Sequence, residues 1–157
     1  MNATLRPATA ADAPRVAGLL IDTRSAFMPY APSAHTEEEL RDWVASQLVP
    51  SGGVTVAELD NTVVAIMATE QSKEHSWVTQ MAVDPELVSQ GIGSALLAHA
   101  IRTLAPPIRI YTFQANVEAR RFYERHGFVA IELTDGQGNE EKCPDVLYEL
   151  RSPEAEA

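Results

Sequence analysis

A strand that passes through a short loop into a glycine-led helix is the strongest constraint on what this chain folds into. The segment from Val83 to Leu97 reads VDPELVSQGIGSALL. Asp84-Pro85 ends the preceding strand, and Gly91 and Gly93 open the helix that follows. The first turn of a helix leaves N–H groups unpaired, and the helix dipole adds partial positive charge there. Because glycine lets a bulky group approach the main chain, the segment is suited to binding a pyrophosphate.

The same glycines have a plainer interpretation, in which they only form a tight turn between strand and helix. Two other phosphate-binding classes are excluded by missing residues: the segment lacks the lysine of an ATPase phosphate-binding loop and the third glycine of a dinucleotide fold. The formal net charge of −10 argues against a nucleic-acid partner and would repel a polyanion at long range. Any phosphate site must therefore be built locally, from main-chain amides.

Length and composition predict a single globular domain over residues 1–157, with short tails at 1–2 and 152–157. No apolar run is long enough to span a bilayer, and the first residues lack the pattern of a signal peptide, so we expect a cytoplasmic protein without a membrane partner. Cys143 is the only cysteine, which excludes an internal disulfide and a cysteine metal cluster. A packing or loop role for Cys143 is favoured over a catalytic thiol, and no metal is expected.

Hydrophobic periodicity and capping signals predict an alternating series of strands and helices. Strands are predicted at residues 3–6, 54–59, 62–69, 76–83, 108–113, 128–133 and 146–150. Helices are predicted after the capping boxes Thr9/Asp12 and Thr36/Glu39, from about 91 to 104, and from the cap Asn116 to about 126. Asp60-Asn61 predicts a hairpin turn. The order β-α-α-β-β-β-α-β-α-β-β indicates an α+β (α/β mixed) fold with helices packed on a mixed sheet.

A second informative segment runs from Asn116 to Phe128 and reads NVEARRFYERHGF. Asn116, Ala119 and Tyr123 are three, four and seven residues apart, so they share one face of the predicted helix. Ala119 is small enough to let a ligand chain pass, and Tyr123 would place its hydroxyl one turn further on. The alternative for Tyr123 is a half-buried aromatic with its hydroxyl at the surface.

Together the two segments resemble the characteristic motifs of the GNAT superfamily of N-acetyltransferases. The first motif of that family has Gln or Arg, two residues, Gly, one residue, then Gly or Ala. Gly91 and Gly93 match it, whereas Val88 departs from the Gln/Arg position. The second motif, with Asn, Ala, Phe-Tyr and Gly-Phe, is matched throughout, and the resemblance extends over essentially the whole chain.

This resemblance implies a central, mostly antiparallel twisted sheet of about seven strands flanked by about four helices. It also implies acetyl-CoA as co-substrate. The residues expected to bind it are Met81, Ala82, Val83, Val88, Ser89, Gln90, Gly91, Ile92, Gly93, Ser94, Asn116, Ala119 and Tyr123. In the family the strand corresponding to residues 76–83 splays from its neighbour, which frees main-chain groups for the pantetheine arm.

The chemistry that the resemblance implies is direct attack of an amine on the thioester. Backbone N–H groups at Met81–Val83 would stabilise the carbonyl oxygen, and Tyr123 would protonate the departing thiolate. Glu70 or His75, acting through water, is the candidate base, and each has an alternative as a surface loop residue. A further alternative is an amine that arrives already deprotonated and needs only a path of water.

The resemblance places the acceptor pocket between the N-terminal helix-loop region and the loop at 135–145. The residues expected there are Phe27, Tyr30, His35 and Gln80. Glu140, Glu141 and Asp145 in that loop would favour a cationic amine, but the solubility of the loop is the favoured explanation for these acids.

The function expected from the sequence is acetyl transfer from acetyl-CoA to a primary amine, in a small molecule or a peptide. The alternative is an acyl-CoA-binding sensor with the same fold and little catalysis. A homodimer is a further expectation, which the sequence leaves open.

Overall fold

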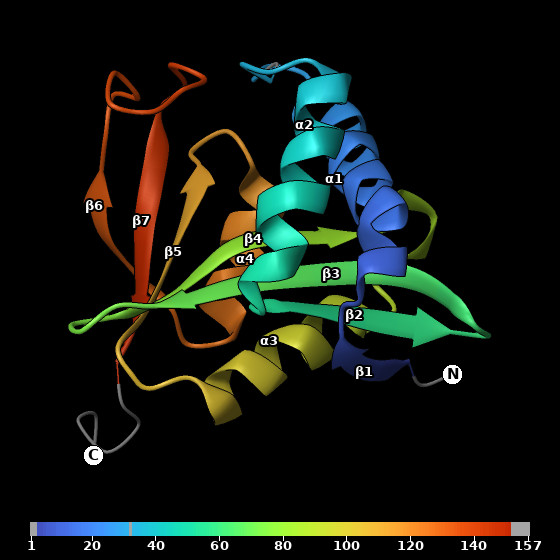
Figure 1. Ribbon diagram of the computed structural model, residues 1–157. Helices are drawn as coiled ribbons and strands as arrows, with labels where there is room; N and C mark the ends of the chain where they lie inside the picture. Colours follow the sequence, from blue (N-terminus) through green and yellow to red (C-terminus); the bar gives the residue numbers. More distant parts are fainter. Residues whose placement is uncertain (1–2, 32, 152–157) are drawn as a thin grey trace.

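Seven strands form one sheet in the computed structural model, which describes residues 3–31 and 33–151. The two tails expected at 1–2 and 152–157 lie outside the described residues. The strand order is β1-β2-β3-β4-β5-β7-β6, with four main helices packed on the sheet, and this confirms the predicted fold class and element order (Figure 1). No helix in the described part of the chain has the length and apolar character needed to cross a bilayer.

The elements follow the predicted positions closely. The strands are β1 (Thr4–Pro7), β2 (Val54–Leu59), β3 (Thr62–Gln71), β4 (Ser76–Val83), β5 (Ile108–Phe113), β6 (Val129–Leu133) and β7 (Asp145–Leu150). The helices are α1 (Ala13–Phe27), α2 (Glu37–Trp43), α3 (Ile92–Thr103) and α4 (Val117–Arg125). Short 3₁₀ turns precede α1 and follow β4, and α2 continues into a π-helical turn at Val44–Leu48. The bounds of β1, β6 and β7 differ from the prediction by one residue, and β3 ends two residues later than predicted, at Gln71.

Turn and cap signals account for this agreement. Asp60 and Asn61 have φ of 51° and 64°, the left-handed pair that a two-residue hairpin needs. The Thr36 N–H donates to the Glu39 carboxylate at 2.8 Å, and the Glu39 N–H donates to the Thr36 hydroxyl at 3.1 Å. The capping box predicted there is therefore confirmed, and it starts α2 at the expected residue.

The helices cover the sheet from both sides. On one side, Val16 and Leu19 of α1 pack with Val44 and Leu48 against β2 and β3. On the other side, the buried stripe of α3 and the residues Tyr123 and Phe128 pack against β4, β5 and β7. The predicted core face of α3 is confirmed, since Ile92, Leu96, Leu97 and Ala100 are all buried.

All neighbouring strands are antiparallel except β4 and β5, which are parallel. These two strands pair only at their beginnings, where Ser76 lies opposite Ile108 and Trp77 opposite Arg109. From there they diverge, as Figure 1 shows. Among the described residues, residues 78–83 of β4 have no strand partner on the β5 side, so main-chain groups at the centre of the sheet are left without a ladder partner. The Val83 carbonyl accepts instead from the Thr23 hydroxyl at 3.4 Å.

Candidate functional site

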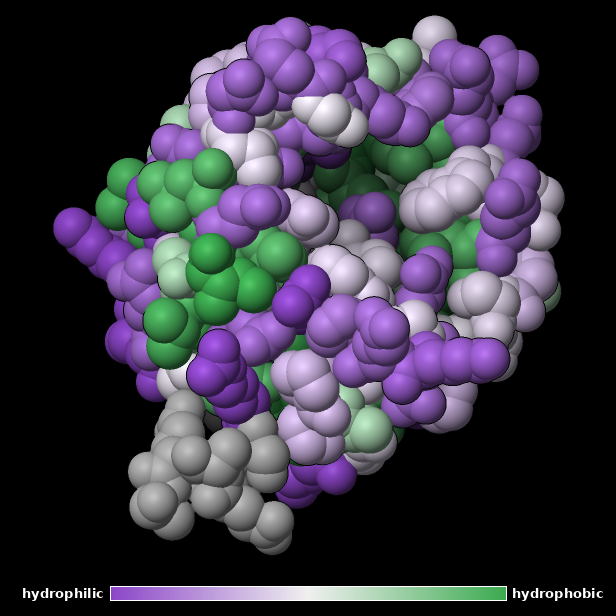
Figure 2. All heavy atoms as spheres, turned by 90° about the vertical axis from the view of Figure 1, so that its left-hand side faces the viewer, coloured by the Kyte–Doolittle hydropathy of each residue, from purple (hydrophilic) through white to green (hydrophobic). Residues whose placement is uncertain are grey.

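A cavity of about 1140 Å³ lies where β4 and β5 diverge. Figure 2 shows it as a hollow that leads into the molecule, with hydrophobic side chains on its inner wall. Its walls come from α1, the second half of β4, the loop before α3, β5, α4 and the β6–β7 loop. The free main-chain edge of β4 therefore faces an open space large enough for an extended ligand.

The loop before α3 forms one end of this cavity. It follows Asp84, whose carboxylate accepts the Glu86 N–H at 3.0 Å and forms an ion pair with Arg15 at 3.1 Å. Ser89 and Gly91 both have left-handed backbone conformations, with φ of 66° and 85°. The loop is thus held at its start by α1 and turned sharply just before the helix.

The N-terminus of α3 opens into the cavity with free amides. The first helical hydrogen bond runs from the Ala95 N–H to the Gly91 carbonyl at 3.0 Å. The amides of residues 92–94 precede it, so helix geometry leaves them without an intrahelical acceptor. Gly91, Gly93 and Ser94 line the cavity. Together with the helix dipole, these groups form an anion site without any lysine.

Glycine stands at positions 91 and 93 in different structural environments. Gly91 adopts a left-handed conformation, and the space that a Cβ would enter there is open, so the backbone alone favours glycine. At Gly93 a Cβ would lie 3.4 Å from Cζ of Phe122, an ordinary contact that alanine can make. The turn interpretation of Gly91 and the anion-site interpretation are therefore compatible.

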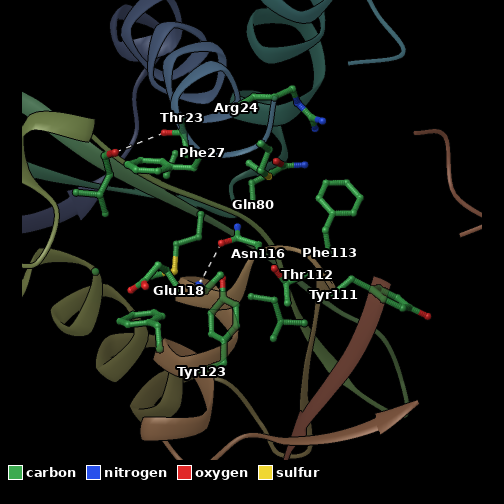
Figure 3. A pocket seen from close by; sticks show the side chains of 18 of the residues that line it. Thr23, Arg24, Phe27, Gln80, Tyr111, Thr112, Phe113, Asn116, Glu118 and Tyr123 are labelled. Carbon is green, nitrogen blue, oxygen red and sulfur yellow. Dashed lines mark hydrogen bonds between the residues drawn. The ribbon is translucent and has the colours of Figure 1, made fainter. Parts of the chain in front are cut away.

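Helix α4 supplies the opposite wall. The Asn116 side chain accepts the Ala119 N–H at 3.2 Å and caps the helix, which confirms the predicted cap. Figure 3 shows Asn116 and Tyr123 on one side of the cavity, with Thr23, Arg24 and Phe27 of α1 across from them. One helical face thus presents its polar cap and its phenol to the same space.

Tyr123 is buried, with 7% of its surface exposed, and its ring lies against Phe122, Phe128 and Tyr148. Among the described residues its hydroxyl has no hydrogen-bond partner, although the residue lines the cavity. Burial raises the pKa of the phenol above its ordinary value. The hydroxyl therefore keeps its proton at neutral pH and is available as a donor.

A buried polar contact holds α4 in place beneath Tyr123. The hydroxyl of Tyr148, on β7, donates to the Glu124 carboxylate at 2.7 Å and accepts from the Arg120 guanidinium at 3.1 Å. Tyr148 has no exposed surface. Because a buried hydroxyl that loses its partners costs free energy, these bonds fix the rotation of α4 on the sheet.

Most of the residues predicted to bind the cofactor lie together in the cavity wall. Those that line it are Met81, Ala82, Val83, Val88, Ser89, Gly91, Gly93, Ser94, Asn116, Ala119 and Tyr123. Ile92 is instead buried in the core with 6% exposure, and Gln90 is exposed on the loop outside the lining. Neither residue is part of the cavity lining, and the Ile92 side chain packs in the core, so its main chain is the part that can contribute there.

The residues predicted to contact the acceptor do not all lie in the same cavity. Phe27 and Gln80 line the cavity. Tyr30 stands next to it, with its ring 6.2 Å from that of Phe113 in an edge-to-face arrangement. His35 lines a neighbouring hollow of about 410 Å³ instead, and its Nε2 lies 3.0 Å from a Glu140 oxygen.

The two predicted bases lie away from this space. Glu70 is opposite Trp77, at the end of the sheet where β4 and β5 still pair, and it is exposed. His75 precedes β4 and its ring lies 6.2 Å from that of Trp77. Neither lines the cavity, because the cavity opens at the other end of β4. We propose no role in proton transfer for either residue.

Several residues that line the cavity were not predicted from the sequence. They are Thr23, Arg24, Tyr111, Thr112, Phe113, Glu118 and Thr134, whereas Asn139 belongs to the loop at 135–145 that was predicted to border the acceptor pocket. The β5 residues enter the wall because β5 is parallel to β4 and diverges from it, a pairing that no local pattern in either strand indicates. Arg24 is one turn from Phe27 along α1, so the helical period could have indicated it.

Known proteins are similar to this chain in sequence and architecture. The profile described as Acetyltransferase (GNAT) family matches residues 20–128. The peptidyl-lysine N-acetyltransferase YjaB of Salmonella typhimurium is 29% identical over 108 residues, which are 69% of this chain and 68% of that protein. The solution structure of apo-form YjaB from Escherichia coli has a TM-score of 0.75 at 21% identity, over 95% of this chain and 97% of that one.

A structure with a bound ligand has the same fold. The PaiA N-acetyltransferase of Thermoplasma acidophilum, solved in complex with coenzyme A, has a TM-score of 0.75 at 16% identity, over 97% of this chain and 100% of that chain. The sequence match, the splayed parallel pair and the glycine-led helix agree, and this chain belongs to the Acetyltransferase (GNAT) family.

Proposed function

We propose that this protein transfers an acetyl group from acetyl-CoA to a primary amine. The observation that carries the proposal is the divergence of β4 from β5 beyond Trp77, which opens a cavity between the free amides of α3 and the phenol of Tyr123. The relative named as a peptidyl-lysine N-acetyltransferase supports an amine acceptor.

The residues present fit acetyl-CoA as a substrate. The N-terminal amides of α3 suit its diphosphate, because they supply N–H donors and partial positive charge. The unpaired edge of β4 suits its amide-bearing arm, because an extended chain that adds to a free strand edge pairs with the main chain. In this proposal the thioester lies near β4 and α4.

The reaction then needs one proton donor and a path for one proton to leave. The amine nitrogen forms a bond to the acyl carbon, and the carbon–sulfur bond breaks. Tyr123 donates its phenolic proton to the sulfur as it leaves, since burial keeps that phenol protonated. An acceptor that arrives as an ammonium first loses one proton to water, which gives the neutral amine that attacks. As the amide forms, a second proton of the nitrogen passes to water, and that water in turn restores the phenol.

The proposal is tested by acceptor-dependent release of free thiol from acetyl-CoA, with the acetylated product identified by mass spectrometry. We expect release only when a primary amine is present, with a tertiary amine of similar shape giving none. If the folded protein binds acetyl-CoA and yet acetylates nothing in a broad panel of amines and lysine peptides, the sensor alternative replaces the enzyme.

A further inference from the structure

Glu140 and Glu141 of the β6–β7 loop and Asp145 at the start of β7 lie close to the acceptor end of the cavity, and the structure gives each of these acids a different environment. Glu140 has a side chain that is 68% exposed and pairs with His35 at 3.0 Å. Glu141 lines the cavity and pairs with Arg24 at 3.5 Å, and that guanidinium also donates to the Ala31 carbonyl at 2.8 Å. The first acid faces solvent, and the charge of the second is offset by a neighbouring cation.

Asp145 is the third acid, and it is buried without a cation. Its residue is 9% exposed, and it lines the cavity at the start of β7. One carboxylate oxygen accepts from the hydroxyl of Thr134, and the other accepts from the side-chain amide of Asn139 at 3.1 Å. Within residues 3–31 and 33–151, no Lys, Arg or His nitrogen lies within ion-pair distance of it.

Asp145 therefore has acceptor capacity left over. An ionised carboxylate offers about four lone-pair sites, and the two neutral donors fill about half of them. A desolvated anion without a cationic partner is unfavourable in an apolar site, and a bound cation relieves that cost. Asp145 also lines the cavity that the substrate would enter.

The walls beside Asp145 are apolar. Phe113 lies directly opposite Asp145 in the register of β5 with β7, and the ring of Tyr30 lies edge-on to Phe113 at 6.2 Å. Phe27 and Met28 of the α1 end line the same cavity. Burial and the carboxylates of Glu141 and Asp145 raise the pKa of the Cys143 thiol, as expected where the local potential is negative.

From this arrangement we propose that Asp145 binds the ammonium group of the acceptor, and that the acceptor is a primary amine on an apolar stem. An ammonium has three donors, which suit the open sites of the carboxylate, and the stem lies against the aromatic side chains. Both a free alkylamine and the side chain of a lysine have this chemistry. The inference rests on the proposed acetyl transfer and concerns only the acceptor end of that cavity.

The test is a calorimetric titration of the CoA-saturated protein with hexylamine at neutral pH, where it is an ammonium, and with hexan-1-ol, its neutral counterpart. We expect hexylamine to bind the wild-type protein more tightly than hexan-1-ol. In Asp145→Asn, which keeps the shape and removes the charge, hexylamine affinity should fall about tenfold or more, to that of hexan-1-ol. Equal binding of hexylamine to both proteins would overturn the proposal.

Two matched variants separate charge from structure. Glu140→Gln removes an acid of the same loop that lies outside the cavity lining and should leave hexylamine affinity unchanged. Thr134→Val removes a hydrogen bond to Asp145 but keeps the carboxylate, so it should retain most of the affinity. If Thr134→Val weakens hexylamine as much as Asp145→Asn does, Asp145 only braces the loop and the proposal is wrong.

The outcome for the proposed function is read separately, from acetyl-CoA binding and turnover. If the protein turns over another acceptor but does not bind hexylamine, the proposed acetyl transfer stands and the role assigned to Asp145 is wrong. Nα-acetyl-lysine amide, titrated beside hexylamine, distinguishes the two sources of the amine. Tighter binding of the lysine derivative assigns the site to peptides, and tighter binding of hexylamine assigns it to free amines.

Discussion

Tyr123 combines two properties that a proton donor needs, a retained proton and a hydroxyl that faces the substrate space. Its burial raises the pKa of the phenol, and none of the described side chains competes for the hydroxyl. The motif spacing predicted its position, because Asn116 and Tyr123 fall on one helical face. Its burial is a consequence of packing against Tyr148, which belongs to the last strand and which no local pattern links to it.

Replacing Tyr123 by phenylalanine tests that role. We expect kcat for acetyl transfer to fall about 100-fold, the usual contribution of a positioned general acid, while acetyl-CoA affinity stays within about threefold of the wild type. Steady-state kinetics and calorimetry measure the two quantities. Unchanged turnover with a good acceptor would remove Tyr123 from the mechanism.

The same phenol makes a prediction for the pH dependence. A raised pKa keeps the phenol protonated well into the alkaline range, so its deprotonation should not lower kcat below about pH 10. A descending limb between about pH 8 and 9 that disappears in Tyr123→Phe would show that its pKa is instead depressed.

A second residue links sequence to stability at the start of α1. Asp12 is buried and bonds the Arg6 guanidinium at 2.8 Å, and Arg6 also bonds Glu58 at 2.9 Å. The Arg6 guanidinium lowers the pKa of Asp12 to about 2, below its ordinary value of 3.8. A carboxyl whose pKa is lower in the folded state than in the unfolded state stabilises the fold at every pH above its unfolded-state pKa. That stabilisation is lost as the pH falls through the folded-state pKa.

We therefore expect Asp12→Asn to lower the free energy of unfolding by about 1–2 kcal/mol at pH 7. The difference from the wild type should shrink as the pH falls from about 4 towards 2, because the wild-type carboxyl then also loses its charge. Urea unfolding at about pH 7, 4 and 3 measures this. A difference that stays constant over this range would mean that packing, not the ion pair, is lost.

At the scale of elements, caps and turns in the sequence were sufficient to place nearly every helix and strand. Asp60-Asn61, Thr36 with Glu39, and Asn116 each end or start an element where the structure has it. These signals are local, since each depends on hydrogen bonds within a few residues. The divergence of β4 from β5 is not local, and it could be predicted only through the resemblance to a family.

The same limit explains why the site was predicted unevenly. The residues predicted to bind the cofactor lie on two short motifs, and most of them line the cavity. The acceptor wall is assembled from α1, β5 and the β6–β7 loop, far apart in the chain. Its charge was predicted, but which of Glu140, Glu141 and Asp145 faces the cavity depends on pairings with His35 and Arg24 that require the fold.

The glycine-led start of α3 allows a matched pair of variants. Gly91→Ala forces a side chain into a left-handed conformation and should lower the free energy of unfolding by about 1 kcal/mol and weaken CoA binding. Gly93→Ala is the control, because its Cβ makes an ordinary contact with Phe122 and alanine favours a helix. Urea unfolding and calorimetry with CoA should both separate the two. Equal behaviour would show that the left-handed turn has no part in forming the site.

At the scale of the molecule, the sheet is continuous towards both edges and opens in the middle. Helices α1 and α2 cover one face, α3 and α4 the other, and the cavity lies between the two halves of the sheet where β4 leaves β5. A substrate that bridges this opening contacts elements from both halves. It should therefore stabilise the whole fold and not only the loop that it binds.

This bridging predicts a thermal shift. Acetyl-CoA at about 100 times its dissociation constant should stabilise the folded protein by about 2.7 kcal/mol, which raises Tm by about 5–10 °C for a chain of this size. Thermal unfolding with and without acetyl-CoA measures the shift, with adenosine at the same concentration as a control that lacks the diphosphate and the thioester arm. An equal rise in Tm with adenosine would show that the stabilisation does not come from contacts of the diphosphate and the thioester arm with the splayed strands.

The most direct measurement is an NMR titration of the amide-labelled protein with acetyl-CoA. We predict saturable shifts that are largest for the amides of residues 88–94 and of Met81–Val83, with the amides of β1 and β6 nearly unmoved. Saturable binding that shifts the amide signals of other residues and leaves those of Gly91 and Gly93 unshifted would contradict the account. The diphosphate would then be held by groups other than the helix terminus.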